Sequence, residues 1–235
     1  MNAPYGLAVI ESCCECKLRQ GFCDFSSETL RAFNAMGHKQ TYPPGALLFA
    51  EGQNPRGILV LCSGRVKLST ASREGKVLIL KVASPGAVLG LSAVLSGVPY
   101  EATAETVTPC RVNFLTRDHL AGFLSRYGEA GIRAARAVSK EYQDACLEIQ
   151  EILLAPSSAG KLAKLLLSWA EGGGNGTGEG RVRSMLTHEE MAQMIGASRE
   201  TVTRVLTQLK RKQIIRLEGS TLVIRNRMGL EQLAT

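Results

Sequence analysis

The segment 185–225 constrains the fold more than any other, because it predicts two short helices joined by a tight turn and followed by a β-hairpin. Thr187 followed three residues later by Glu190 is a capping box, so we expect a helix to begin there and to run to Ile195. Gly196 can adopt the left-handed conformation that ends a helix in a sharp turn. This arrangement predicts a helix-turn-helix motif.

The second helix of this motif has an apolar and a polar face. Ser198 offers a hydroxyl cap, and the apolar face is formed by Val202, Val205, Leu206 and Leu209. Arginine can donate two parallel hydrogen bonds to guanine, and glutamate can accept one from cytosine, so Arg199, Glu200 and Arg204 suit a half-site containing G and C. The predicted DNA-contacting set is Ser198, Arg199, Glu200, Thr201, Thr203 and Arg204.

Two short strands, 214–218 and 221–225, are expected around Gly219–Ser220 and would form a wing. Cations gather around them at Lys210, Arg211, Lys212, Arg216, Arg225 and Arg227. Residues 157–235 carry 12 Lys and Arg against 7 Asp and Glu, whereas residues 1–156 carry 16 against 14. Most of the formal charge of +7 therefore lies in the last third of the chain, which favours a polyanionic partner and salt-sensitive binding.

The segment 41–115 predicts short strands separated by turns, which is typical of an antiparallel β-roll or jelly roll. We expect the turns at Pro44–Gly45, Gly52, Gly64, Gly75 and Pro85–Gly86. The 235 residues suffice for two domains, and we expect neither a membrane span nor a signal peptide. Seven cysteines without an export signal favour a reduced cytoplasmic setting, with thiols or metal ligands in place of a disulfide framework.

No proline interrupts the helical pattern from Arg117 to Leu154, which Gly122, Gly128 and Gly131 are expected to divide into a short and a long helix. The long helix carries a heptad seam at Ala135, Val138, Tyr142, Ala145, Ile149 and Ile152. Such a seam predicts a partner helix, with packing against the chain's own β-roll as the alternative. After a break at Pro156–Ser158, we expect a helix at Gly160–Ala170 and a surface loop at Gly172–Gly180.

These motifs resemble the Crp/Fnr family of bacterial transcription regulators across nearly the whole chain. The segment ASRETVTR is similar to the recognition helix of the cyclic AMP receptor branch, whose base-contacting residues match Arg199, Glu200 and Arg204. The resemblance implies palindromic double-stranded DNA with TGTGA-like half-sites, a parallel homodimer along the long helix, and RNA polymerase as a further partner.

The resemblance also implies an α+β fold with a cyclic-nucleotide-binding-like β-roll, a long dimerisation helix and a winged helix-turn-helix. The expected division is a cysteine-rich segment 1–24, a β-roll sensor domain 25–117, a dimerisation helix 118–155 and a DNA-binding domain 156–235.

Cyclic AMP is not the expected effector. In family members that bind cyclic nucleotides, an arginine and a serine hold the phosphate and a glutamate holds the ribose. Here the matching segment 85–105 contains no Lys or Arg, and Leu91 stands at the glutamate position. The phosphate arginine falls near Tyr100 or Glu101, where a phosphodiester would meet a carboxylate in place of a cation. The segment GLSAVLSG is more similar to the Fnr branch.

Cys13, Cys16 and Cys23 form a C-x2-C-x6-C pattern, and thiolates at such spacing bind iron-sulfur clusters or zinc. In the Fnr branch a β-roll cysteine is the fourth ligand, and Cys110 stands at that position. The resemblance thus implies a [4Fe-4S] cluster on these four residues, with Cys14 as a substitute ligand. Zinc or a thiol switch, and no cofactor at all, remain alternatives, because the last spacing is one residue longer than in the best-known Fnr proteins.

We therefore expect a homodimeric transcription regulator that responds to redox state, oxygen or nitric oxide. The alternative is the same kind of regulator without a cofactor, or with an uncharged small molecule in the β-roll. An enzyme with Cys13 or Cys14 as nucleophile is disfavoured, because no acid–base partner accompanies these thiols.

Overall fold

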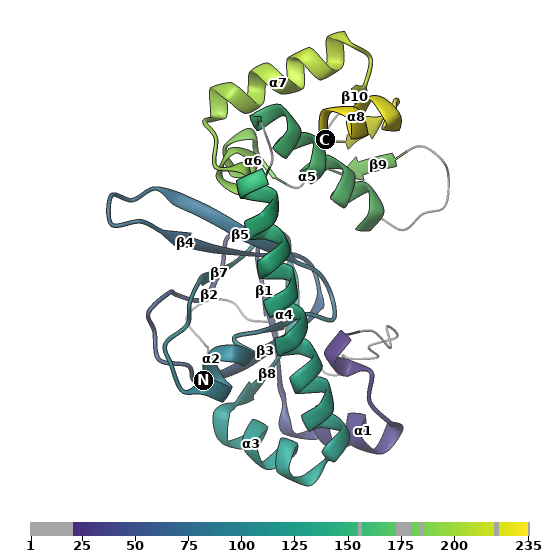
Figure 1. Ribbon diagram of the computed structural model, residues 1–235. Helices are drawn as coiled ribbons and strands as arrows, with labels where there is room; N and C mark the ends of the chain where they lie inside the picture. Colours follow the sequence, from purple (N-terminus) through teal and green to yellow (C-terminus); the bar gives the residue numbers. More distant parts are fainter. Residues whose placement is uncertain (1–20, 155–156, 173–179, 184–185, 219–220, 235) are drawn as a thin grey trace. The chain divides into compact units, whose positions relative to one another are not determined.

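The computed structural model describes residues 21–154, 157–172, 180–183, 186–218 and 221–234 (Figure 1). The chain divides into two compact units, Met1–Gln143 and Asp144–Thr235, and the boundary lies inside the longest helix. None of the described helices is both long enough and apolar enough to cross a lipid bilayer. Each unit is described below by itself.

The first unit contains two four-stranded antiparallel sheets, as the sequence predicts. One sheet has the order β1-β8-β3-β6 and the other β2-β7-β4-β5. The strands are β1 (His38–Tyr42), β2 (Leu47–Phe49), β3 (Gly57–Ser63), β4 (Val66–Ala71), β5 (Val77–Ala83), β6 (Val88–Leu89), β7 (Thr103–Thr106) and β8 (Cys110–Thr116).

The β-roll core lies on both faces of the first sheet, because successive side chains of a strand point in opposite directions. Leu59 and Leu61 of β3 face the second sheet and pack with β8 residues such as Val112. Ile58 and Val60 face the other way, into a cluster that includes aromatic residues of the flanking helices. The apolar run of β3 is therefore buried on both faces.

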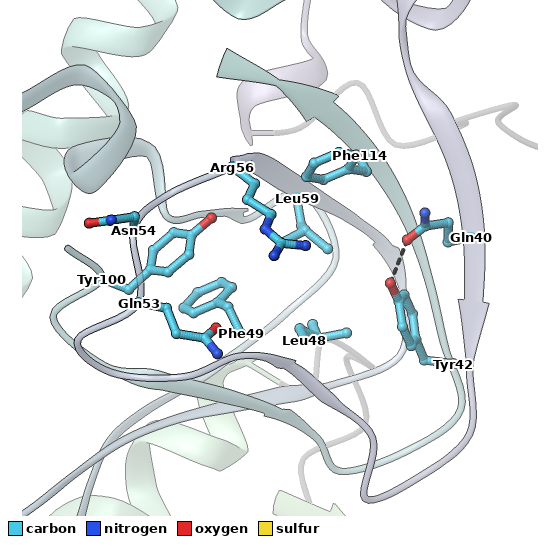
Figure 2. A pocket seen from close by; sticks show the side chains of 10 residues that line it. All are labelled: Gln40, Tyr42, Leu48, Phe49, Gln53, Asn54, Arg56, Leu59, Tyr100 and Phe114. Atoms are coloured by element: carbon cyan, nitrogen blue, oxygen red, sulfur yellow. Dashed lines mark hydrogen bonds between the residues drawn. The ribbon is translucent and has the colours of Figure 1, made fainter. Parts of the chain in front are cut away.

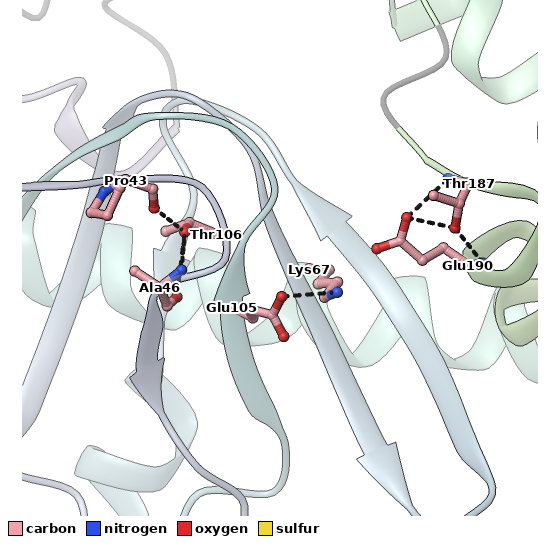
Figure 3. A network of polar contacts seen from close by, with 7 residues as sticks. All are labelled: Pro43, Ala46, Lys67, Glu105, Thr106, Thr187 and Glu190. Atoms are coloured by element: carbon pink, nitrogen blue, oxygen red, sulfur yellow. Dashed lines mark hydrogen bonds and ion pairs between the residues drawn. The ribbon is translucent and has the colours of Figure 1, made fainter.

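The glycine turns that the sequence predicts are confirmed. Gly45, Gly52, Gly64, Gly75 and Gly86 all have positive φ, between 75° and 94°. At Gly64 space is also limited, because a Cβ would lie 2.4 Å from the Pro109 carbonyl oxygen and 2.5 Å from the Sγ of Cys110. At the first turn Thr106 adds a clamp, because its Oγ1 donates to the Pro43 carbonyl at 2.6 Å and accepts from the Ala46 N–H at 2.8 Å (Figure 3).

Four helices and one short 3-10 turn complete the first unit: η1 (Gly21–Cys23), α1 (Ser27–Met36), α2 (Leu91–Ser96), α3 (Arg117–Arg126) and α4 (Gly128–Leu154), which continues past the unit boundary. The expected short and long helices are α3 and α4. They divide at Tyr127, next to Gly128, which confirms the expected division into a short and a long helix, and Gly122 and Gly131 lie inside the helices.

Helix α4 has a buried and an exposed face, so the expected seam is only partly correct. Ala135 and Tyr142 are exposed, Tyr142 to 72%, as is Ala145. Val138 instead packs against the helix-covered side of the β-roll, because it lies four residues after the buried Ala134 and therefore on the same face of the helix. Val138 therefore does not belong to the exposed stripe. The side chains of Ile149 and Ile152 lie outside the described part of the chain.

The second unit contains a helix-turn-helix and a three-stranded antiparallel sheet of order β10-β11-β9. Its elements are α5 (Ser158–Gly172), β9 (Gly180–Arg183), α6 (His188–Ile195), α7 (Arg199–Arg211), β10 (Ile215–Glu218), β11 (Thr221–Ile224) and α8 (Arg227–Ala234). The predicted helices and wing strands are confirmed to within two residues. Strand β9 and helix α8 were not predicted, and Pro156 and residues 173–179 lie outside the described residues.

Candidate nucleic-acid interface

Helix α6 begins with the predicted capping box (Figure 3). The Thr187 Oγ1 accepts from the Glu190 N–H at 3.2 Å, and the Glu190 Oε2 accepts from the Thr187 N–H at 2.9 Å. Two of the N–H groups that a helix start leaves unpaired are thus satisfied. The helix ends at Gly196 in the left-handed conformation, with φ 65° and ψ 33°.

The turn leads directly into α7, and Ser198 caps this helix by accepting from the Thr201 N–H at 3.2 Å. The Ser198 hydroxyl also donates to the Thr201 Oγ1 at 3.2 Å. Both hydroxyls therefore hold the first turn of α7. Ser198 and Thr201, predicted as DNA contacts, have this structural role in the free protein.

Helix α7 separates an apolar from a polar face as the sequence predicts. Val202, Val205, Leu206 and Leu209 are buried. Arg199, Glu200, Thr203 and Arg204 are exposed. Burial of the apolar face orients the helix, so the four polar side chains are presented to solvent together on a rigid element.

The Glu200 carboxylate is held in its charged form. Its pKa lies below the ordinary value because it accepts hydrogen bonds from its own backbone N–H and from Ser198, and because Arg199 is nearby. A glutamate that stays ionised at neutral pH acts only as a hydrogen-bond acceptor. This chemistry suits the exposed amino group of cytosine.

A contact that the sequence did not predict joins α6 to the polar face of α7. The His188 Nδ1 and the Thr203 Oγ1 form a hydrogen bond of 3.0 Å. The half-buried His188 is the first residue of α6, so the capping box fixes its position. The sequence predicted that His188 lies in a helix. It could not predict the hydrogen bond to Thr203, 15 residues later, because this contact depends on the angle between the two helices.

The cations expected around the wing are confirmed as exposed: Lys210, Arg211, Lys212, Arg216, Arg225 and Arg227. Arg216 lies 3.8 Å from Glu218, and Arg227 lies 2.7 Å from Glu231. Both ion pairs are on the surface, where carboxylates compete only weakly for a guanidinium. These residues remain accessible to an anionic backbone.

The β-roll segment that matches the cyclic-nucleotide site contains apolar groups at two of its expected polar positions. Leu91 is 1% exposed and belongs to the helix-covered core. Tyr100 is 5% exposed, and its hydroxyl donates to the Gly57 carbonyl at 2.7 Å. Glu101 is exposed. Leu91 and Tyr100 therefore have structural roles that leave them unable to replace a ribose carboxylate and a phosphate cation.

The structure does not bring Cys23 and Cys110 together as a ligand pair. Both are buried, but Cys23 belongs to the helix-covered cluster and Cys110 to the cluster between the sheets. The Cys110 thiol points at the carbonyl oxygens of Arg65 and Thr108, at 3.2 Å and 3.1 Å. Burial raises the pKa of the Cys110 thiol.

Cys110 as described therefore does not fit the fourth position of an iron-sulfur cluster. Cys13, Cys14 and Cys16 lie outside the described residues. Within the described ranges, His, Cys, Asp and Glu side chains form no group of three or more that could hold a metal ion. Cys62 and Cys146, in β3 and α4, are half-buried.

Comparison with family models agrees with both halves of this architecture. Residues 160–233 match the Crp-like helix-turn-helix domain, and residues 39–127 match the cyclic nucleotide-binding domain. The two matches do not overlap and follow the same order as the two structural units.

Among curated proteins, the chain is similar to a CRP-like cAMP-activated global transcriptional regulator of Mycobacterium tuberculosis, with 29% identity over 184 residues, 78% of this chain and 82% of that protein. It is also similar to the cyclic AMP receptor protein of Thermus thermophilus, with 26% identity over 83% of this chain and 88% of that protein.

Solved structures show the same fold. FixK2 from Bradyrhizobium japonicum has a TM-score of 0.75 at 20% identity, covering 85% of this chain and 98% of that chain. A CRP/FNR-family transcriptional regulator from Thermus thermophilus has a TM-score of 0.68 at 25% identity, covering 84% and 98%. With a cyclic nucleotide-binding domain followed by a Crp-like helix-turn-helix, the chain belongs to the Crp/Fnr family of DNA-binding transcription regulators.

Proposed function

We propose that this regulator binds, as a homodimer, a palindromic DNA site with TGTGA-like half-sites, through Arg199, Glu200 and Arg204 of each protomer. The observation that carries the proposal is that all three side chains are exposed on α7 while the opposite face of the helix is buried. An arginine fork matches guanine O6 and N7, and an ionised glutamate matches cytosine N4. RNA polymerase is the expected further partner, in the cytoplasm.

Fluorescence anisotropy with a labelled palindromic duplex tests the base contacts. Arg204→Ala should weaken binding by about 1–3 kcal/mol per half-site and should abolish discrimination against a duplex with the matching guanine replaced. Lys210→Ala, at the other end of α7, is the control. It should weaken binding to all duplexes alike and lower the salt slope by about 1. Equal losses for Arg204→Ala on specific and random DNA would contradict the assignment.

The homodimer is supported by an exposed apolar stripe on α4. Ile132 is 57% exposed and Tyr142 is 72% exposed, and together with the exposed Ala135 they have the spacing of a heptad seam. We expect Tyr142→Glu to give monomers in sedimentation equilibrium, because a charge would be buried in the seam. Lys140→Glu, on another face of α4, should remain dimeric. A dimer of unchanged affinity in Tyr142→Glu would remove α4 from the interface.

A second proposal concerns the signal, which we assign to the amino-terminal cysteines Cys13, Cys16 and Cys23. Their spacing supports a metal centre, a [4Fe-4S] cluster or zinc, with a cofactor-free thiol segment as the alternative. The described surroundings of Cys110 argue against its role as the fourth ligand. Cys14, in the same amino-terminal segment, is a possible substitute ligand.

Anaerobic purification followed by iron, sulfide and zinc analysis tests the metal centre. About four irons per chain, with absorbance near 400 nm that bleaches in air, would support a cluster. Cys13→Ser should then lose the metal, whereas Cys62→Ser, the control, should keep it. Retention of the cluster in Cys110→Ser would confirm that Cys110 is not a ligand. Metal-free protein that binds the palindrome would refute the proposal.

We further infer that cyclic AMP is not the effector, although the two relatives described above are named for it. The support is the absence of Lys and Arg from segment 85–105 and the burial of Leu91. Isothermal titration calorimetry with cyclic AMP should show no saturable binding to protein that binds DNA. Saturable binding at micromolar concentration would overturn this inference.

A further inference from the structure

A cavity of about 450 Å³ lies at the edge of the β-roll, between β1, β3 and β8 of one sheet and β2 of the other (Figure 2). Its size is within the roughly 300–1,000 Å³ range of small-molecule sites. It is lined by Gln40, Tyr42, Leu48, Phe49, Gln53, Asn54, Arg56, Leu59, Tyr100 and Phe114. Of the segment that matches the cyclic-nucleotide site, only Tyr100 contributes to this lining, so the two sites are different.

The charged groups of the lining are all of one sign. Arg56 is its one cation, and none of the other lining residues is an Asp or Glu. Figure 2 shows the Arg56 guanidinium among the aromatic and aliphatic side chains of the cavity. In the described part of the chain no carboxylate forms an ion pair with it. The guanidinium thus keeps a planar set of donors that matches a carboxylate or phosphate.

Besides Arg56, the lining combines amide side chains with aromatic and aliphatic ones. Among the latter, Phe49, Leu59 and Tyr100 are buried, whereas Leu48 and Phe114 are half-buried. The rings of Phe49 and Tyr100 are stacked, with centroids 4.0 Å apart and planes 18° apart. Tyr100 is fixed by its hydrogen bond to the Gly57 carbonyl, and Leu59 is 4% exposed. Phe114 lies on the other side of Arg56 in Figure 2. A ligand with a planar apolar body would cover the half-buried side chains of Leu48 and Phe114 and remove them from water.

The polar groups near Arg56 are amides and a phenol. The Tyr42 hydroxyl donates to the Gln40 Oε1, which holds both side chains at the edge of the cavity. The Gln53 Oε1 accepts from the Ala50 N–H at 3.0 Å, which leaves its amide NH₂ as a donor. These groups can orient a bound carboxylate but do not neutralise Arg56.

We propose that this cavity binds a small aromatic carboxylate, with its acid group on Arg56 and its ring against Leu48 and Phe114. An uncharged ligand would leave Arg56 without a counter-charge, and an inorganic anion would leave the apolar walls exposed to water. This site belongs to the β-roll and is independent of the proposed base contacts of α7.

Titration calorimetry of the full-length protein with 2-naphthoate, its neutral amide 2-naphthamide, and inorganic phosphate tests the proposal. We expect saturable binding of one naphthoate per chain, and at least about tenfold weaker binding of both naphthamide and phosphate. Equal binding of naphthoate and naphthamide would refute the role of Arg56. Equal binding of phosphate and naphthoate would refute the aromatic ligand class.

Two variants locate the bound molecule. Arg56→Gln should weaken naphthoate binding about tenfold or more, because a charge-assisted pair of hydrogen bonds is lost. Arg73→Gln, an exposed arginine in the turn between β4 and β5, is the matched control and should bind as the wild type does. Leu48→Trp should fill the cavity and abolish binding. Unchanged affinity in both Arg56→Gln and Leu48→Trp would place the ligand elsewhere and overturn the proposal.

DNA binding provides a separate readout. Both cavity variants should bind the palindromic duplex as the wild type does in the absence of naphthoate, because α7 is unchanged. A variant that no longer binds naphthoate but still binds DNA therefore supports the cavity proposal. Loss of DNA sequence preference in the wild type would instead contradict the proposed function and leave the calorimetric result standing.

Discussion

A single methyl group at Gly64 should both strain the backbone and clash with the β-roll. Gly64 joins β3 to β4 with φ 94°, and a Cβ at this position would lie 2.4 Å from the Pro109 carbonyl oxygen and 2.5 Å from the Sγ of Cys110. A left-handed backbone costs an alanine about 1–2 kcal/mol, and overpacking adds about 1–3 kcal/mol. We therefore expect Gly64→Ala to lower the free energy of unfolding by about 2–5 kcal/mol.

Gly75, at the other end of β4, is the matched control. Its φ is 80°, but no atom lies within 4 Å of a Cβ built there. Gly75→Ala should therefore cost only the backbone strain of about 1–2 kcal/mol. The difference in stability between the two variants isolates the steric clash with Pro109 and Cys110.

Urea unfolding followed by far-ultraviolet circular dichroism measures both variants. The single tryptophan, Trp169, lies in α5 of the second unit, so its fluorescence should report that the DNA-binding unit is unchanged. Alkylation of Cys110 by iodoacetamide should be slow in the wild type and faster in Gly64→Ala, where the thiol is displaced. Equal loss of stability in the two glycine variants would refute the proposed clash.

Three further predictions concern helix ends. Thr187→Ala should destabilise the DNA-binding unit by about 1 kcal/mol, seen as earlier urea unfolding by Trp169 fluorescence, and an unchanged midpoint would remove the capping box as a stabilising element. Gln213 follows α7 with φ 56°, so Gln213→Gly should raise stability by up to about 1 kcal/mol in the same assay, whereas a loss would show that its side chain compensates for the strain. The Glu129 carboxylate accepts hydrogen bonds from Ser26 at the start of α1, and these lower its pKa. The contribution of Glu129 to the stability of the fold is therefore fully present above the unfolded-state pKa and is lost as the pH falls through the lower folded-state pKa. Glu129→Gln should consequently lower the melting temperature at pH 7, and this difference should disappear in acid; a difference independent of pH would exclude the charge as its cause.

The helix-turn-helix could be predicted from the sequence almost residue by residue, because its signals are local. A capping box, a glycine turn and apolar residues at helical spacing act within about two helical turns of each other. The glycine turns of the β-roll are equally local. Strand β9 was missed because its pairing partner β11 lies some 40 residues away, and its own four residues carry a weak pattern.

The candidate site residues also divide into those that the local sequence predicts and those that depend on tertiary packing. The exposed position of Arg199, Glu200 and Arg204 follows from helical periodicity, whereas the hydrogen bond between His188 and Thr203 requires the packing of two helices. The family resemblance implied a shared site for Cys23 and Cys110, and in the structure these two side chains are buried in different apolar clusters.

The sequence by itself determined the order of the elements, the ends of the recognition helix and the residues on its polar face, because these depend on neighbours along the chain. The tertiary structure decided that Val138 packs against the β-roll, that Cys110 is buried, and that the cavity lined by Arg56 contains no carboxylate. Each of these features depends on contacts between strands and helices that are distant in the sequence. Such contacts are selected by the burial of apolar surface, which occurs only when the whole chain packs together.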